Sequence, residues 1–258
     1  LLVMYWVFEA TKEPRYFSPR EFLLDDGHLF LMLTINFMGI MIGIAYYNAE
    51  SFLYLLRQTT QQLQCYSEWF LGKNLLAQAV DNPSMLTLNR RERAVLFMDI
   101  RGFTHWSESQ SPEIVVNMLN HYCEIAEQSW HSSDEVIKAK LTGDEIMIVF
   151  QSPHSAITVA TNLHQRVAKL LANYELGVGI GIHWGSLVEG LVGSHKVKAY
   201  DIIGDTVNTA KRICDVATRG EVLISKSVYE SVYPVVGTPR HLKVKGKTEA
   251  ILVYPLSL

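Results

Sequence analysis

Two aspartates stand where a buried strand and a tight turn would present them together. Asp99 lies near the end of the apolar run Ala94–Ile100, shortly before Gly102, and Asp144 lies in the short turn Thr142–Glu145. A carboxylate at the mouth of a buried strand, followed by a glycine loop into a helix, can hold a divalent metal ion beside backbone amides that face a phosphate. A Gly-Asp turn alone is usually only a turn. In one sheet, however, the two carboxylates could bracket one or two metal ions, as phosphoryl-type transfer requires.

Other residues that could bind a substrate follow in the C-terminal half. Asn208 and Arg212 are four residues apart in the run Tyr200–Arg212, so a helix would present both on one face. The segment Lys243–Lys247 is a basic hairpin near the C-terminus. The alternative for the helix residues is an ordinary polar helix face, and a solvated charge cluster is the default explanation of the hairpin, so neither feature identifies a site by itself.

Strands and helices that could position these residues alternate from Ala94 onward. Apolar runs bounded by turn residues predict strands, and Ser111-Pro112-Glu113 is a helix-start signal. The expected strands are 94–100, 136–141, 146–150, 177–183, 222–224, 241–244 and 251–254, and the expected helices are 111–130, 156–172 and 206–218. The order strand, helix, hairpin, helix, strand predicts an α+β fold of ferredoxin-like βαββαβ type.

A long uncharged run precedes this domain. Leu29–Tyr47 holds nineteen residues without a charge, and a helix of this length spans roughly the ~30 Å hydrocarbon core of a bilayer. The alternative is a buried helix of a soluble protein. We expect a transmembrane helix at 29–47, preceded by an N-terminal segment, 1–28, that begins with the apolar run Leu1–Phe8. That run is too short to span a bilayer and is compatible with the end of an earlier membrane helix.

Residues 48–91 are expected to form a linker that transmits signals to the catalytic part. Its first half carries residues at alternating spacings of four and three, as in the seam of a coiled coil: Phe52, Leu56, Thr59, Leu63, Tyr66 and Phe70. An amphipathic helix lying on its own domain fits the same spacing equally well. Asp81-Asn82-Pro83-Ser84 is expected to break the helix, and the charged run Arg90–Arg93 marks the start of the C-terminal domain, 92–258.

Composition excludes several classes of function. The 258 residues include 23 basic and 26 acidic side chains, so no global positive field favours binding to nucleic acid. The three cysteines are far apart and have no CxxC spacing, which argues against a disulfide framework and against a zinc site. A reducing cytoplasm is the simpler environment for the C-terminal domain.

In this order, four stretches of residues 94–258 resemble the catalytic domain of class III nucleotide cyclases, the adenylate and guanylate cyclases. They are FMDIRGFT, KLTGDEIM, YDIIGDTVNTAKR and VKGK. The resemblance implies conversion of ATP to 3′,5′-cyclic AMP and pyrophosphate, by in-line attack of the ribose 3′-hydroxyl on the α-phosphate. It also implies two divalent ions per site, Mg²⁺ or Mn²⁺, and sites shared across a homodimer. Because ATP is cytoplasmic, it implies a membrane-anchored protein whose catalytic domain lies in the cytoplasm.

The resemblance further implies a role for each matching residue. Asp99 and Asp144 match the metal ligands of the family, with assistance from the carbonyl group of Ile100. Arg212 matches the arginine that stabilises charge on the α-phosphoryl group, and Asn208 matches the residue that orients the ribose. The remaining substrate contacts that it implies are Lys245, Lys247, Gly102 and Phe103, all toward the phosphates.

Two positions that match the purine-selecting residues of the family favour adenine. Lys140 is a hydrogen-bond donor and Asp201 an acceptor, which complements the acceptor N1 and the donor N6 of adenine but not guanine. Lys138 is a rival for the role of Lys140, because it lies two residues away on the same strand face. A diguanylate cyclase and a catalytically silent dimerisation or nucleotide-binding module are the competing functions. The turn TGDEI resembles the hairpin of diguanylate cyclases, although its first glycine is missing and those enzymes lack the DTVNTAKR element.

Overall fold

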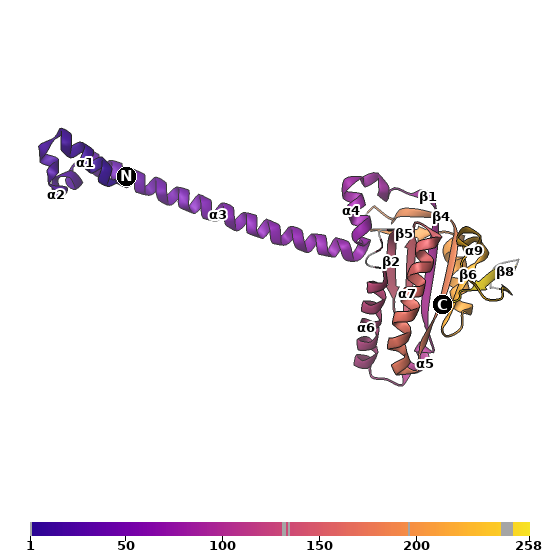
Figure 1. The fold of residues 1–258 in the computed structure, drawn as a ribbon. Helices are drawn as coiled ribbons and strands as arrows, with labels where there is room; N and C mark the ends of the chain where they lie inside the picture. The colour runs from indigo at the N-terminus through magenta and orange to yellow at the C-terminus, as the bar shows by residue number, and fades with distance from the viewer. Residues whose placement is uncertain (1, 131–132, 134, 196, 244–249) are drawn as a thin grey trace. The chain divides into compact units, whose positions relative to one another are not determined.

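The computed structural model describes residues 2–130, 133, 135–195, 197–243 and 250–258. Its contacts divide the chain into two units, Leu1–Tyr66 and Ser67–Leu258. The first unit consists of helices, and the second combines a sheet with helices (Figure 1). The mixed α+β class predicted for the C-terminal domain is therefore confirmed.

The first unit contains α1 (Leu2–Lys12), a short 3-10 turn (Pro14–Phe17), α2 (Pro19–Leu24) and most of α3 (Asp26–Leu71). The predicted span 29–47 lies inside α3, which is long and apolar enough to cross a membrane. None of its most apolar window is buried inside the protein, which argues against the alternative of a buried core helix. The expected break at residues 81–84 is preceded by an earlier one, because α3 ends at Leu71 and Gly72 begins a new helix in left-handed backbone geometry (φ 84°).

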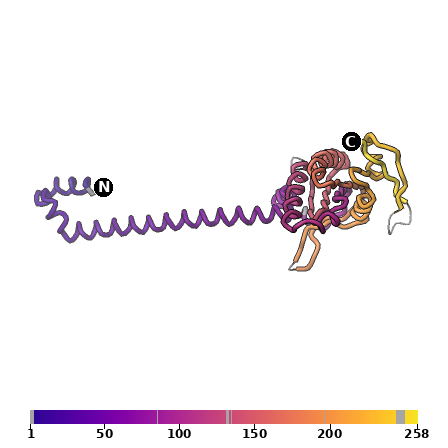
Figure 2. Tube along the Cα trace, turned by 90° about the horizontal axis from the view of Figure 1, so that it is seen from below, coloured from indigo at the N-terminus to yellow at the C-terminus, as the bar shows by residue number. Residues whose placement is uncertain are grey.

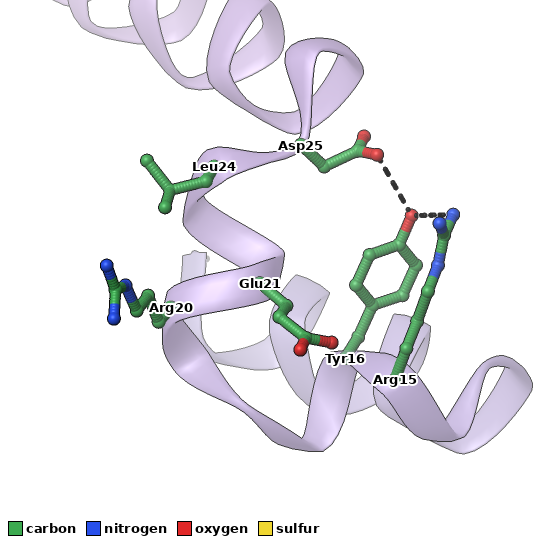
Figure 3. Close-up of a pocket in the computed structure, with 6 residues that line it drawn as sticks. All are labelled: Arg15, Tyr16, Arg20, Glu21, Leu24 and Asp25. Carbon is green, nitrogen blue, oxygen red and sulfur yellow. Dashed lines mark hydrogen bonds between the residues drawn. The ribbon is translucent and has the colours of Figure 1, made fainter.

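Three aromatic rings enclose His28 at the start of α3. Its imidazole stacks on Phe22 at 4.3 Å between ring centroids and meets the rings of Tyr16 and Tyr5 edge-on at 4.7 and 5.6 Å. The hydroxyl of Tyr16 accepts a hydrogen bond from Arg15 Nη2 (2.6 Å) and donates one to Asp25 Oδ1 (3.3 Å) (Figure 3). These contacts join α2 to the first turn of α3, beside an open depression of about 440 Å³.

The second unit is built on one eight-stranded sheet, in the order β2-β3-β1-β4-β6-β8-β7 with β5 added to β4. The strands are β1 (Asn89–Arg101), β2 (Val136–Thr142), β3 (Glu145–Phe150), β4 (Gly177–Gly193), β5 (Lys198–Ile203), β6 (Glu221–Ser225), β7 (Arg240–Leu242) and β8 (Ile251–Pro255). The helices are α4 (Lys73–Asp81), α5 (Phe103–Glu108), α6 (Pro112–Trp130), α7 (Pro153–Leu171), α8 (Asp205–Val216) and α9 (Lys226–Val232), with 3-10 turns at Pro83–Leu86 and Ala172–Tyr174.

Helices cover both faces of this sheet. The apolar sides of α6, α7 and α9 pack on one face, where α6 and α7 are seen in Figure 1. Helices α4 and α8 pack on the other face. Within the central strands, β1 lies antiparallel to β3 and to β4, with Met98 opposite Ile146 and Asp99 opposite Gly179. The sheet therefore brings the end of β1 next to the β2–β3 turn, as the sequence predicted.

The central strands are longer than predicted, and the short elements α5, β5 and α9 of this unit were not predicted. β1 begins at Asn89 instead of residue 94, and β4 continues from the predicted end at His183 to Gly193. The extension of β4 pairs with β5 in a hairpin that protrudes from the rest of this unit (Figure 2). Helices α5 and α9 are only six and seven residues long, which leaves little periodicity to detect. Val244, the predicted end of the seventh strand, lies outside the described residues.

Helix α8 lies almost directly on the backbone of β4. A Cβ atom on Gly181 would stand 2.2 Å from the backbone nitrogen of Cys214, and one on Gly179 would stand 2.7 Å from the carbonyl oxygen of Ala217. Both distances are too short for a side chain, and the atoms named are backbone atoms that cannot turn aside; at Gly179 the guanidinium of Arg101 would be closer still, at 2.5 Å. The alternating glycines of β4 are thus needed for the close approach of the helix.

We expect Gly181→Ala to destabilise the second unit by about 1–3 kcal/mol or more, because the added methyl group must push α8 away from the sheet. Urea unfolding of the full chain, followed by intrinsic fluorescence, measures the change in the free energy of unfolding. Gly237→Ala is the matched control, since a Cβ there meets no atom closer than 3.8 Å. Equal stability of the two variants would contradict the close-approach argument.

Candidate active site

The side chain of Arg101 joins the end of β1 to the C-terminal end of α8. Its Nε donates to the carbonyl oxygen of Ala217 (2.9 Å), and Nη2 donates to the carbonyl oxygen of Cys214. Its Nη1 donates to Asp99 Oδ2 (3.2 Å). The last carbonyl groups of a helix lack partners within the helix and favour a cation nearby. Arg101 therefore caps α8 and at the same time holds the Asp99 carboxylate.

The two aspartates predicted to bind metal come together at this end of the sheet. Asp144 lies in the β2–β3 turn, where the buried Tyr122 hydroxyl donates to its carbonyl oxygen (3.1 Å). The pKa of the Asp144 carboxyl is raised to about 6, first because the group is partly buried and then because it faces the carboxyl group of Asp99. The prediction from sheet adjacency therefore agrees with the observed geometry.

A lysine that the sequence analysis did not single out also enters this cluster. Lys211 of α8 pairs with Glu145, the residue after Asp144, and with Asp215 (Nζ to Oδ1, 3.0 Å). The same ammonium group stands 3.8 Å from Asp99 Oδ2. These carboxylates raise the pKa of Lys211 in spite of its partial burial. The signal available in the sequence was its position in DTVNTAKR, directly before Arg212.

The residues at this end of the sheet fit a divalent cation. Carboxylate oxygens are the donors that Mg²⁺ and Mn²⁺ prefer, and the carboxyl group of Asp144 faces that of Asp99, which adds to the effect of burial on its pKa. No third side chain of this kind completes the set of ligands, because the described residues contain no group of three or more His, Cys, Asp or Glu side chains arranged to hold a metal ion. Ile100, whose carbonyl was expected to assist, follows Asp99 on β1 with its side chain buried.

Asn208 and Arg212 lie on α8, but not against the aspartates. Asn208 is exposed and Arg212 is partly exposed. Because successive residues of a helix are rotated by about 100°, the side that carries Arg212 differs from the side on which Lys211 meets Asp99. Within the described part of the chain, no hydrogen bond or ion pair joins Asn208 or Arg212 to Asp99 or Asp144.

The predicted purine-selecting residues lie on β2 and β5. Lys138 Nζ donates to the carbonyl oxygen of Tyr200 and stands 5.6 Å above the ring of that tyrosine. Burial lowers the pKa of Lys138, the nearby carboxylate of Asp201 opposes this shift, and the charge of Lys140 adds to it. Lys140 is exposed, and Asp201 Oδ1 accepts a hydrogen bond from the amide of Ile202 (3.0 Å). The charges of Lys140 and Asp201 therefore both act on the ammonium group of Lys138.

The remaining predicted substrate contacts are only partly described. Gly102 precedes α5 in left-handed geometry (φ 85°), and Phe103 begins that helix and packs near Trp106, with 6.1 Å between ring centroids. Lys245 and Lys247 lie outside the described residues.

Comparison with known proteins agrees with this geometry. The sequence model of the adenylate and guanylate cyclase catalytic domain matches residues 89–256. An adenylate cyclase of Anabaena cylindrica is 30% identical over 197 residues, which are 69% of this chain and 39% of that protein. The chain thus spans about two fifths of the length of this curated relative.

Solved structures of both nucleotide specificities resemble the second unit. The adenylyl cyclase CyaB from P. aeruginosa superposes with a TM-score of 0.61 at 25% identity, over 67% of this chain and 97% of that one. The guanylyl cyclase Cya2 superposes with a TM-score of 0.61 at 26% identity, over 65% of this chain and 92% of that one. The likeness itself does not choose between the two bases.

In metal-free protein we expect the carboxyl of Asp144 to titrate near pH 6, and Asp99→Asn to lower that pKa, because the facing charge is removed. The raised pKa means that protonation favours the folded state. This contribution is present below the ordinary pKa of 3.8 and is lost as the pH rises through about 6. Carboxyl ¹³C NMR in the presence of a chelator measures the titration, with Glu124→Gln as a control at an exposed position. A wild-type midpoint near the ordinary value would contradict the paired geometry.

Proposed function

The chain belongs to the adenylate and guanylate cyclase catalytic domain family, and we propose that it is an adenylate cyclase, which converts ATP to 3′,5′-cyclic AMP and pyrophosphate. The observation that carries the proposal is the pair of carboxylates, Asp99 and Asp144, at the end of β1. The strand order β2-β3-β1-β4 supports a ferredoxin-like core for this domain. An ordinary structural ion pair joins opposite charges, whereas these two carboxyl groups face each other, an arrangement that suits a divalent cation.

Each site residue has a proposed part in the reaction. Divalent ions, two Mg²⁺ or Mn²⁺ per site, would supply charge neutralisation to the triphosphate and acidity to the ribose 3′-hydroxyl when held by Asp99 and Asp144. The guanidinium of Arg212 offers several donors to the oxygens of the α-phosphoryl group, where charge develops in the transition state. The amide of Asn208 orients the ribose. Phosphate binding is assigned to the glycine loop and the basic hairpin, by way of Gly102, Phe103, Lys245 and Lys247.

The preference for ATP rests on Lys140 and Asp201. A lysine donor and an aspartate acceptor complement adenine, and guanine would leave donor facing donor and acceptor facing acceptor. Lys138 already donates to the carbonyl group of Tyr200, so its ammonium group is engaged in holding β2 near β5. Lys140 is exposed, which supports it over Lys138 as the lysine that reads the base.

Two complete sites would form in a homodimer. Lys211 turns toward Asp99 of its own chain, and the next residue, Arg212, faces a different direction. This arrangement supports a site in which one protomer supplies the aspartates and the other supplies Asn208, Arg212 and the base-reading residues. A twofold-symmetric pair of copies would then contain two equivalent sites.

Membrane anchoring is the proposed role of the N-terminal part. We assign residues 1–28 to an N-terminal segment, 29–47 to a transmembrane helix, 48–91 to a linker and 92–258 to a catalytic domain in the cytoplasm, where ATP is available. Large apolar side chains remain exposed along the linker part of α3, including Phe52, Leu56, Leu63 and Phe70. A parallel coiled coil between two copies would bury them.

The proposed activity predicts cyclic AMP and pyrophosphate as products when the purified chain is incubated with ATP and Mn²⁺. With Lys140→Glu and Asp201→Cys together, we expect ATP turnover to fall at least about tenfold, because each mismatched polar group costs ~1–3 kcal/mol when it is buried unpaired. Chromatography of the nucleotide products is the measurement, and Lys169→Glu on the exposed side of α7 is the control. Cyclic GMP as the main product would indicate a guanylate cyclase, a cyclic dinucleotide a diguanylate cyclase, and no product a silent module.

The shared site predicts complementation between two inactive variants. Asp99→Ala and Arg212→Ala should each be nearly inactive as homodimers. After subunit exchange, about half of the dimers are mixed, and each mixed dimer has one intact site, so about a quarter of wild-type activity should return. If each site were built from a single chain, mixing would restore nothing. Subunit exchange is verified separately with differently tagged chains.

A further inference from the structure

Among the described residues of α8, only Lys211 has a side chain that reaches a proposed metal ligand of its own protomer. Its ammonium group pairs with Glu145 and lies 3.0 Å from Asp215 Oδ1 and 3.8 Å from Asp99 Oδ2. Arg101 approaches the same oxygen of Asp99 at 3.2 Å. Two cations therefore share one carboxylate oxygen at the position where a divalent ion is proposed to bind.

The charges of this cluster leave an excess of negative charge. Asp99, Asp144, Glu145 and Asp215 carry four negative charges when they are all ionised, and Lys211 and Arg101 carry two positive charges. The remainder is two negative charges. Without Lys211 the cluster would have three, and the carboxylate of Glu145 would lose its partner next to the Asp99–Asp144 pair.

Lys211 is not required to hold α8 on the sheet. The Arg101 side chain already fixes the C-terminal end of the helix through the carbonyl groups of Cys214 and Ala217. The backbone of α8 is seated on Gly179 and Gly181 independently. The ammonium group, whose side chain is 34% exposed, is therefore free to have an electrostatic role.

We propose that Lys211 is a positioning residue that sets the metal affinity of the Asp99–Asp144 pair, by occupying Glu145 and Asp215 and by opposing the charge of an incoming divalent ion. The inference rests on the proposed function, because it takes these two aspartates as metal ligands. In this arrangement the cluster keeps a modest affinity for the free ion, and the triphosphate supplies the additional negative charge needed for tight binding. Metal would then be bound mainly together with substrate.

Mn²⁺ binding to the 258-residue chain, purified in detergent without nucleotide, tests the proposal. The signal of free Mn²⁺ in electron paramagnetic resonance gives the dissociation constant at constant pH and ionic strength. We expect Lys211→Met to tighten binding at least about tenfold, because a positive charge within about 4 Å of a ligand oxygen is removed. Lys211→Arg keeps the charge and should bind Mn²⁺ as the wild type does. Asp215→Asn leaves Lys211 in place with one carboxylate fewer and should weaken binding a few-fold, by about two to five times.

Matched controls separate the possible results. Lys226→Met removes a lysine of α9 that also forms an i,i+4 ion pair, with Glu230 at 3.5 Å, far along the sequence from the aspartates, and should leave binding unchanged. One result would overturn the role of Lys211 but keep the metal site. In that result Asp99→Asn abolishes Mn²⁺ binding, whereas Lys211→Met binds Mn²⁺ as weakly as the wild type or more weakly. Binding by the wild type that does not depend on Asp99 would overturn the proposed metal site as well. If Lys211→Met does not fold, unchanged binding by Asp215→Asn overturns the proposal.

Discussion

One guanidinium group connects the parts of the second unit on which the candidate site depends. Arg101 caps the C-terminal end of α8 and holds the carboxylate of Asp99 with the same side chain. Since the helix carries Asn208, Lys211 and Arg212, the cap fixes where these residues stand relative to the end of β1. Loss of this side chain would remove the cap of the helix and a partner of the aspartate together, so one residue serves both the fold of the domain and the arrangement of charges around the site.

The electrostatics of the site follow from this support. The carboxylates at this end of the sheet would repel one another, but Arg101 and Lys211 form ion pairs with them. Asp144 has a raised pKa because its carboxyl group is partly buried and faces the carboxyl group of Asp99. On the other strands of the same sheet face, Lys138 and Lys140 accompany the single carboxylate of Asp201, so positive charge prevails there. The domain therefore presents a region in which acidic groups prevail and a region in which basic groups prevail.

The proximity of Asp99 and Asp144 could be predicted because it needs only a strand order, and the apolar runs that build these strands are plain in the sequence. The role of Lys211 could not, since it depends on the rotation of α8, which is set by β4 glycines some thirty residues earlier in the chain. The charged run before residue 94 is part of β1, where Arg93 forms a two-bond ion pair with the buried Glu189 of β4 (2.9 and 2.7 Å). A pattern of exposed charges gives no sign of a partner so distant in sequence.

The glycines of β4 have a consequence for how this domain can diverge in evolution. At Gly179 and Gly181 the helix excludes every side chain, whatever the chemistry of the site, whereas Asp99 and Asp144 matter only while the chain performs a reaction. A descendant released from selection for activity could exchange the aspartates without losing the fold, but it could not exchange the glycines as freely. A related sequence that has the alternating glycines but lacks the two aspartates would therefore indicate a domain that kept this fold after it had lost the activity.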